Sequence, residues 1–353
     1  MYDLSIPNPI PISHRYLFVG GGSGGHTVPL LAVRQALLKK EPGAEIRFLS
    51  SEKQLDHDFL EREGIAYDPV PYPRLGMSFI PSFWKNYGTA ARIIRNWKPD
   101  AVFSKGSALS VPACIIARMK GIPVVLHESD AVMGSANRFV TRLATTVCTG
   151  FPDSRYVHTG NPVREQMTHG SREEGLRLTG LSGTRPILLV MGGSQGAQSI
   201  NETIWKNLDA LLKVCDVIHL TGTGKQKTIS RAGYWSSEMS SGELHHLYAV
   251  TDLAVSRAGA GSIGELAANG IPTILVPIRG LAHDHQYKNA LVARDNGGCV
   301  LLLQEEIGKK LISEISRILA DDGLRSQMRK KISAMHHPEA AVRIAKIIAE
   351  CVA

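Results

Sequence analysis

A short apolar run, a glycine-rich turn and a helical pattern follow one another twice in this chain. Tyr16–Val19 leads into Gly20-Gly-Gly-Ser-Gly-Gly-His26 and a helical pattern to about Lys40. Pro186–Val190 leads into Met191-Gly-Gly-Ser-Gln-Gly-Ala197 and a helical pattern over Ser199–Leu212. A strand that enters a helix through a tight glycine turn is the building unit of parallel α/β sheets. The repeat predicts two similar α/β domains rather than one large sheet.

The same layout occurs again within residues 252–290. Leu253–Val255 reads as a buried strand, Ala258–Ser262 as a turn of small residues, and Ile263–Ala268 as a helix that ends at Asn269-Gly270. Small residues let a ligand approach the backbone, and the first amides of a helix attract an anion. We therefore expect an anion at this turn.

Glu265 falls inside the first turn of that predicted helix. Its carboxylate would repel a phosphate there unless it faced another group. One carboxylate accepts hydrogen bonds from two hydroxyls, so a ribose diol is a fitting partner. The alternative is a surface Glu that only stabilises its own helix end, and the residue taken alone leaves both open.

Composition limits the classes of protein. A chain of 353 residues suggests two domains, and 43% hydrophobic with 20% charged residues is typical of a globular protein. No apolar run approaches the ~18 residues of a membrane span, and residues 1–13 lack the features of a signal peptide. The net charge of +8 fits phosphorylated substrates, nucleic acid or an anionic membrane surface. The five scattered cysteines indicate neither disulfides nor zinc and favour a reducing cytosol.

The first glycine run permits a different class of enzyme. Gly20-x-Gly22-x-x-Gly25 matches the dinucleotide fingerprint, and Glu52 could stand for its ribose-binding acid, so a nicotinamide oxidoreductase is a rival. His26 lies at the start of the following helix, where the dipole favours a neutral imidazole able to accept a proton. We take His26 as a candidate general base; the alternative is a histidine that caps or packs against the loop.

Three other segments carry functional signals. Residues 72–98 interleave aromatic and aliphatic side chains with Arg and Lys, which is typical of a face on an anionic bilayer, with a core helix as the equal alternative. His127-Glu-Ser-Asp130 follows a predicted strand at the end where parallel sheets bind ligands. Gly160-Asn-Pro-Val-Arg164 breaks the pattern and marks the domain boundary. Adjacent residues such as His283-Asp-His285 cannot readily converge on one ion, so no metal site is expected.

Six motifs, in order along the chain, resemble those of the MurG family, the peptidoglycan lipid II synthases. They are Gly21–His26, His127–Asp130, Gly160–Arg164, Gly192–Ala197, Ser256–Ala260 with Glu265, and Asp284–Gln286. Six motifs in register over most of the chain are highly specific. The resemblance implies the GT-B glycosyltransferase fold, an α/β architecture of two Rossmann-like domains whose parallel sheets face a cleft.

The resemblance also implies a reaction and its partners. Members of the family transfer N-acetylglucosamine from UDP-GlcNAc to the MurNAc 4-hydroxyl of undecaprenyl-pyrophosphoryl-MurNAc-pentapeptide (lipid I), with inversion, and so make lipid II. No cofactor, metal or nucleic acid is implied, and the enzyme would sit peripherally on the cytoplasmic face of the cell membrane through residues 72–98. Residues 1–163 would bind acceptor and membrane, and residues 164–337 would bind UDP-GlcNAc. The helix at 338–353 would pack back on the first domain.

The family's site, carried over by resemblance, falls on residues of both halves. Glu265 would hold the ribose hydroxyls, Ser194 a phosphate oxygen and Gln286 the GlcNAc hydroxyls. Arg164 would touch the nucleotide, and His26 would take the proton from the acceptor hydroxyl. The residues that would line the diphosphate and sugar with backbone amides are Ala260, Gly261, Ser262, Ile263 and Gly264. Those that would close the cleft from the acceptor side are Ser23, Gly24, Gly25 and Asp130.

One segment departs from the family pattern. Met239-Ser-Ser-Gly-Glu243 stands where the family has an acidic-aromatic-aliphatic run whose backbone reads uracil, and Ser241 is assigned to that contact. Two rivals remain beside the nicotinamide enzyme: a glycosyltransferase of the same superfamily that uses diacylglycerol, and a non-catalytic membrane-bound scaffold. The N-terminal motifs favour a lipid II synthase over a diacylglycerol glycosyltransferase. The retained site residues argue against a non-catalytic scaffold.

Overall fold

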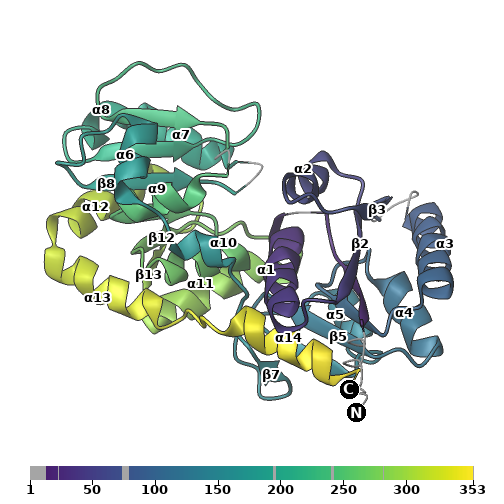
Figure 1. Ribbon diagram of the computed structural model, residues 1–353. Coiled ribbons are helices and arrows are strands. Elements are labelled where there is room, and N and C mark those ends of the chain that lie inside the picture. The colour runs from purple at the N-terminus through teal and green to yellow at the C-terminus, as the bar shows by residue number, and fades with distance from the viewer. Residues whose placement is uncertain are drawn as a thin grey trace, which may run out of the picture. The chain divides into compact units, whose positions relative to one another are not determined.

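The structure is a computed structural model, and it contains two parallel β-sheets with helices on both faces (Figure 1). It describes residues 13–22, 24–73, 79–193, 196–239, 242–280 and 282–352, without the side chains of Leu55 and Ala282.

The first sheet has seven strands in the order β3-β2-β1-β4-β5-β6-β7. Its strands are β1 Arg15–Val19, β2 Glu45–Ser51, β3 Tyr67–Val70, β4 Ala101–Ser104, β5 Val124–Glu128, β6 Thr146–Thr149 and β7 Val157–His158. The helices among them are α1 Gly24–Lys40, α2 Gln54–Arg62, α3 Phe79–Trp97, α4 Val111–Met119 and α5 Ser135–Val140. Strand β1 pairs in parallel with both β2 and β4, which is the arrangement at the centre of a doubly wound sheet.

The second sheet has six strands in the order β10-β9-β8-β11-β12-β13, and β8 occupies the place that β1 has in the first. Its strands are β8 Ile187–Met191, β9 Asp216–Leu220, β10 Tyr234–Ser237, β11 Leu253–Ser256, β12 Thr273–Leu275 and β13 Cys299–Leu301. The remaining helices are η1 Glu165–Thr168, α6 Arg172–Thr179, α7 Gln198–Lys206, α8 Leu208–Leu211, α9 Leu244–Val250, α10 Ala260–Ala268, η2 Ala282–Asp284, α11 His285–Asn296, α12 Ile307–Ala320, α13 Asp322–Ser333 and α14 Ala340–Glu350. The prediction of two similar parallel α/β folds is confirmed.

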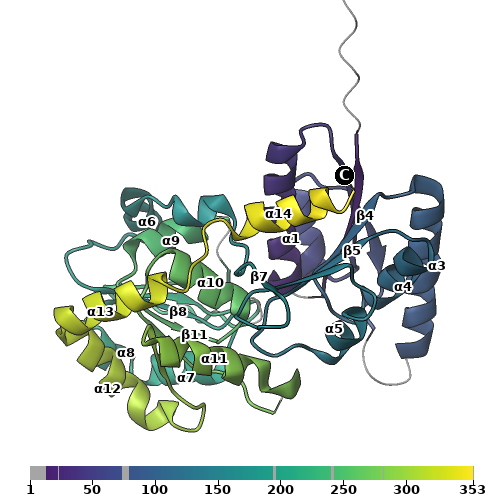
Figure 2. The ribbon, with the colours of Figure 1, turned by 90° about the horizontal axis from the view of Figure 1, so that it is seen from below.

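The apolar runs of the second half form strands that are buried on both faces. Because successive side chains point to opposite faces, Leu188 and Val190 pack in one core cluster with α7 and α12. Ile187 and Leu189 pack in another with α9 and α10. Figure 2 shows α9 and α10 on one side of β8 and β11, with α7 and α8 on the other.

The chain divides into two compact units, and neither is one continuous stretch. Unit 1 contains the chain up to Leu126, Phe139–Thr146 and the segment from Val342 on. Unit 2 contains His127–Arg138 and Val147–Ala341. The loop after β5 therefore belongs to unit 2, as do β7 and most of β6, whereas the domain ranges expected from the sequence stay a prediction.

Two helices differ from expectation. The helix expected over Ser199–Leu212 is two helices, α7 and α8, which separate at Asn207. The side-chain Nδ2 of Asn207 donates to the Thr203 carbonyl oxygen at 2.8 Å, and such local side-chain bonds compete with regular helix. Helix α10 begins at Ala260 instead of Ile263, because its N-cap is Gly259. The small residues expected to form a turn are thus its first turn.

Helix α3 has both a core face and an exposed aromatic face. Asn86, Ala90, Ile93 and Ile94 are buried, while Ile80 is 66% and Trp84 63% exposed. The helix lies beside α4 (Figures 1 and 2). Within the described ranges, none of the helices has the length and apolar character needed to cross a bilayer.

Candidate active site

The N-terminus of α10 is the centre of the candidate site in unit 2. Strand β11 enters it through Arg257, Ala258 and Gly259. The amides of the first helical turn have no partner within the helix, so Ala260, Gly261 and Ser262 remain able to bind an anion. The Ile263 amide already donates to the Gly259 carbonyl oxygen at 3.0 Å, and Gly264 is deeper in the helix. The helix starts earlier than expected, and the predicted contacts of Ile263 and Gly264 with the donor stay a prediction.

Arg257 fixes the turn before α10. Its guanidinium donates to the Val276 carbonyl oxygen at 2.9 Å, to Ser199 Oγ at 3.2 Å and to Gln304 Oε1 at 2.8 Å. The side chain is buried, and burial lowers the pKa of Arg257. Val276 directly follows β12, Gln304 lies in the segment after β13, and Ser199 lies in the first turn of α7, so one cation joins these three segments.

Glu265 lies in the second turn of α10, not the first, and one of its carboxylate oxygens has a partner. The Tyr248 hydroxyl donates to Glu265 Oε2 at 2.8 Å. Burial raises the pKa of Glu265, while the Tyr248 hydrogen bond and the charge of Arg164 lower it. Burial and the charge of Glu265 raise the pKa of Tyr248 well above its ordinary value. The structure thus brings Arg164 and Glu265 together, with a tyrosine that the sequence reading missed.

Asn289 on α11 joins two other parts of unit 2. It is fully buried, and its Nδ2 donates to Asp130 Oδ1 at 2.8 Å and to the Ala258 carbonyl oxygen at 3.1 Å. Its Oδ1 accepts from the Ala131 amide at 2.8 Å. Asn289 therefore holds the Asp130 loop and the turn before α10 against one helix. Its burial is visible only in the folded chain, so no signal in the sequence singles out Asn289.

Gln286 lies one turn before Asn289 on the same helix. Its Oε1 accepts from the Ile278 amide at 3.2 Å, so its carbonyl group fixes the segment after β12. His283 and Asp284, which precede α11, have positive φ angles of 61° and 58°. Such angles are unusual for residues other than glycine and mark a tightly constrained turn. Among the described residues, no group of three His, Cys, Asp or Glu side chains is placed to hold a metal ion.

The His127–Asp130 motif builds the loop that carries Asp130. His127 is fully buried, and its Nε2 lies 3.0 Å from the Gly160 carbonyl oxygen. The Glu128 carboxylate accepts from the Asp130 amide at 2.9 Å, the Gly134 amide at 3.2 Å and Asn137 Nδ2 at 2.7 Å. These two residues therefore have structural partners, and so does Asp130, whose Oδ1 accepts from Asn289.

His26 lies in the first turn of α1 in unit 1, after Gly24 and Gly25. Its Nδ1 lies 3.1 Å from the Lys105 carbonyl oxygen. A carbonyl oxygen only accepts, so Nδ1 carries the hydrogen and the lone pair of the neutral imidazole is on Nε2. That tautomer is the one a general base at Nε2 requires.

The glycine loop before His26 differs from a dinucleotide loop. The Gly22 amide donates to Asp56 Oδ2 at 2.5 Å, so a carboxylate already occupies it. A dinucleotide fold needs the loop amides open to a pyrophosphate. This geometry argues against the nicotinamide rival. Ser23, Ser194 and Ser241, all predicted site residues, lie outside the described residues.

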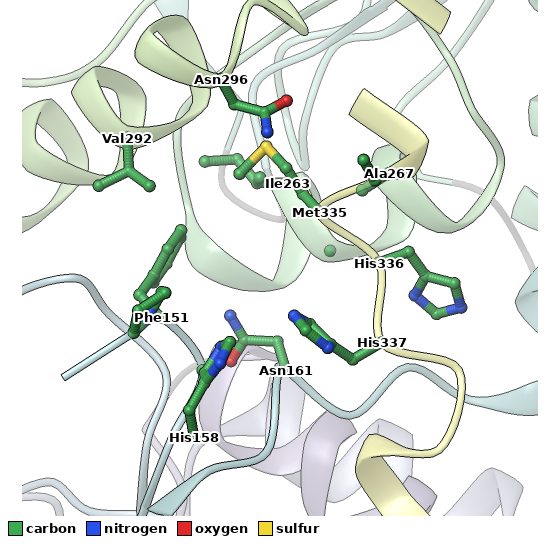
Figure 3. A pocket seen from close by; sticks show the side chains of 14 residues that line it. Phe151, His158, Asn161, Ile263, Ala267, Val292, Asn296, Met335, His336 and His337 are labelled. Carbon is green, nitrogen blue, oxygen red and sulfur yellow. The ribbon is translucent and has the colours of Figure 1, made fainter. Parts of the chain in front are cut away.

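A cavity of about 170 Å³ lies against the other side of α10 in unit 2 (Figure 3). Of the predicted site residues it includes Ile263 and Gly264. The rings of His158 and His337 are 4.7 Å apart and nearly perpendicular, beside Asn161, while the His336 ring points away. Burial and the neighbouring His337 lower the pKa of His336.

Two family models match the chain. The glycosyltransferase family 28 N-terminal domain matches residues 16–149, and the glycosyltransferase family 28 C-terminal domain matches residues 187–344. A protein of Clostridium botulinum (strain Loch Maree / Type A3) is 36% identical over 84% of this chain and 88% of its own length. Its name is UDP-N-acetylglucosamine--N-acetylmuramyl-(pentapeptide) pyrophosphoryl-undecaprenol N-acetylglucosamine transferase.

The chain belongs to the MurG family. A relative of the same name from Caldanaerobacter subterraneus subsp. tengcongensis is 30% identical over 95% of this chain and 99% of its own length. Membership of the MurG family makes the chain a glycosyltransferase and removes the nicotinamide rival.

Solved structures agree on the fold. MurG of Acinetobacter baumannii superimposes with a TM-score of 0.75 at 23% identity, over 96% of this chain and 99% of that one. A putative UDP-N-acetylglucosamine 2-epimerase of Listeria monocytogenes has a TM-score of 0.67 at 14% identity, over 94% and 95%. Because the second is named for a different reaction, the fold alone does not separate a MurG-family transferase from an epimerase.

Proposed function

We propose that this chain transfers N-acetylglucosamine from UDP-GlcNAc to the MurNAc 4-hydroxyl of lipid I and so makes lipid II for peptidoglycan. The observation that carries the proposal is the 36% identity over 84% of the chain to a relative named for that reaction. The two glycosyltransferase family 28 matches, which cover both halves of the chain, support it.

In this proposal the donor binds in unit 2. The amides of Ala260, Gly261 and Ser262 face the diphosphate at the positive end of α10. Glu265, oriented by Tyr248, accepts hydrogen bonds from the ribose hydroxyls. Arg164 contacts the nucleotide and Gln286 the sugar hydroxyls, with Ser194 and Ser241 as further donor contacts. Asp130, Ser23, Gly24 and Gly25 bind on the acceptor side.

The reaction is one in-line displacement. The acceptor 4-hydroxyl oxygen attacks the anomeric carbon, and the bond from that carbon to the UDP oxygen breaks. His26 Nε2 takes the hydroxyl proton, in the tautomer that its Nδ1 contact with Lys105 selects. The electron pair leaves with UDP, whose charge the α10 amides stabilise.

The acceptor is a polyprenyl lipid, and α3 supplies a surface that fits a membrane. Ile80 and Trp84 are exposed on it, with the exposed cations Lys85, Arg92 and Arg95 on the same helix. Apolar side chains flanked by cations bind anionic bilayers. The chain would act as a peripheral protein on the cytoplasmic face of the cell membrane.

Transfer of labelled GlcNAc from UDP-GlcNAc to a short-chain lipid I analogue tests the proposal. Wild type should label the analogue, Glu265→Ala should mainly raise the KM for UDP-GlcNAc, and His26→Ala should mainly lower kcat. The exposed residues Glu173 and His169 offer controls, since Glu173→Ala and His169→Ala should behave as wild type. Labelling of diacylglycerol instead of lipid I would favour the lipid glycosyltransferase. Donor binding without any transfer would favour the scaffold.

A further inference from the structure

A carboxylate in unit 1 is buried directly behind the glycine loop. Asp56 is fully buried and lies in the first turn of α2, just after β2. The positive end of that helix helps to keep a negative charge there. A carboxylate out of contact with water must find hydrogen-bond donors within the protein.

Two of the hydrogen-bond donors to Asp56 lie on either side of His26 in the chain. The Gly22 amide donates to Oδ2 at 2.5 Å, and the Thr27 hydroxyl donates to Oδ1 at 2.5 Å. The Ser51 hydroxyl also donates to Oδ2. Because Gly22 precedes α1 and Thr27 directly follows His26, one side chain is hydrogen-bonded to the chain on both sides of His26.

The other side of Gly22 is held as firmly. Lys53 Nζ donates to the Gly22 carbonyl oxygen at 2.7 Å and lies 4.1 Å from the centre of the Tyr72 ring. A Cβ atom on Gly22 would come within 2.1 Å of that ring, and its φ is +95°. Only glycine fits at this position, and both its backbone N–H and its backbone C=O have side-chain partners.

We propose that Asp56 is a positioning residue of the transfer reaction, which sets the glycine loop and thereby the place of His26. The inference rests on the proposed function, in which His26 Nε2 must lie within hydrogen-bond reach of the acceptor hydroxyl. Asp56 acts through the loop and touches no substrate. Both of its oxygens must accept, which an Asn side chain cannot reproduce because its nitrogen only donates.

The test uses the full chain and conservative substitutions. Asp56→Asn should lower kcat on the order of 10- to 100-fold, because a displacement of about 1 Å has that effect on a positioned group. The KM for UDP-GlcNAc should stay within about twofold of wild type, since the donor residues are in unit 2. Thr27→Val, which removes one hydrogen-bond donor, should lower kcat less than Asp56→Asn does. Thr27→Ser, which keeps the hydroxyl, should retain most of the wild-type kcat. Asp58→Asn on the same helix is the control.

Hydrogen exchange supplies a readout that does not depend on activity. The Gly22 amide should exchange faster in Asp56→Asn than in wild type, while the helix α10 amides are unchanged. A kcat within twofold of wild type in Asp56→Asn would overturn the inference, as would equal losses in Thr27→Val and Thr27→Ser. If Asp56→Asn does not fold, the Thr27 pair decides. Unchanged exchange at Gly22 in Asp56→Asn would also overturn the inference, because Asp56 acts through that contact. Wild-type protein that fails to label lipid I would defeat the proposed function instead.

Discussion

The hydroxyl of Tyr248 donates a 2.8 Å hydrogen bond to Oε2 of Glu265. A carboxylate oxygen can accept more than one hydrogen bond, so this contact orients Glu265 without exhausting it. Burial pushes the pKa of Glu265 above its ordinary value, and Tyr248 and Arg164 oppose that effect. Tyr248 therefore orients the group that we propose binds ribose and favours its ionised form.

Tyr248→Phe should weaken UDP-GlcNAc binding about tenfold at pH 7, because a hydrogen bond to a charged group contributes about 1.5–3 kcal/mol. Loss of the bond removes an effect that lowers the pKa of Glu265, so that pKa should rise further. The ionised form accepts the ribose hydrogen bonds, so donor binding should decline at a higher pH in the variant as the solution is acidified. Calorimetric titration with UDP-GlcNAc across pH measures this. If UDP-GlcNAc binding by Tyr248→Phe declines over the same acidic pH range as that of wild type, the prediction is contradicted.

Asn289→Asp should lower activity and stability more than Asn289→Ala, since it sets a carboxylate against Asp130 at the position of a 2.8 Å hydrogen bond. We expect a loss of about 1–3 kcal/mol in the free energy of unfolding for Asn289→Ala. Adding Asp130→Asn to Asn289→Asp should recover part of the loss, because the donor and acceptor are then exchanged. A double-mutant cycle by urea unfolding gives the coupling, and strict additivity would disprove the contact.

His219 should make unit 2 sensitive to acid. It is fully buried between Tyr234 and Asn201, at 3.1 and 3.0 Å, and burial lowers the pKa of His219 from 6.5 to about 4. The unfolded chain then binds one more proton between those pH values, so the free energy of unfolding should decrease as pH falls from 6.5 toward 4, by about 3 kcal/mol in all. His219→Gln should flatten this dependence in urea unfolding. His169→Gln, at an exposed position, should not.

Gly175→Ala should destabilise unit 2 by about 3 kcal/mol, since overpacking against a backbone atom has no easy relief. A Cβ atom there would come within 2.3 Å of the His246 carbonyl oxygen where α6 meets α9. Gly308→Ala in α12 is the matched control, because no atom lies within 4 Å of a Cβ atom added there. It should raise the free energy of unfolding by about 0.5–1 kcal/mol. Both are measured by denaturant unfolding. Equal effects would show that helix propensity, not packing, governs Gly175.

Trp84→Glu should reduce binding to vesicles that contain phosphatidylglycerol by about tenfold or more, because a charge replaces an apolar side chain among cations. Trp84 is 63% exposed on α3. Val214→Glu, at a site 40% exposed in unit 2, should leave vesicle binding as it is. Sedimentation with vesicles measures both. If both variants bind vesicles equally well, α3 is not the membrane-binding surface.

The sequence predicts the fold well, because the strand, glycine turn and helix of each unit are local and recur. It predicts the start of α10 less well, since Gly259-Ala-Gly-Ser262 has neither an apolar period nor a capping side chain before it. The residue pairs that hold the site together could not be predicted from the sequence, for another reason. Asp130 and Asn289 are 159 positions apart, and Gly22 and Asp56 are 34 apart. Only the folded chain brings such pairs together.

The discontinuity of unit 1 affects how the protein is made. Its last segment, from Val342 on, follows every residue of unit 2 in the chain. On the ribosome, unit 2 can therefore complete its contacts while unit 1 still lacks α14, whose side chains Ile344 and Ile348 are buried in the finished fold. The half of the chain that is synthesised first is the half that closes last, so substitutions in α14 should act on the maturation of the N-terminal sheet.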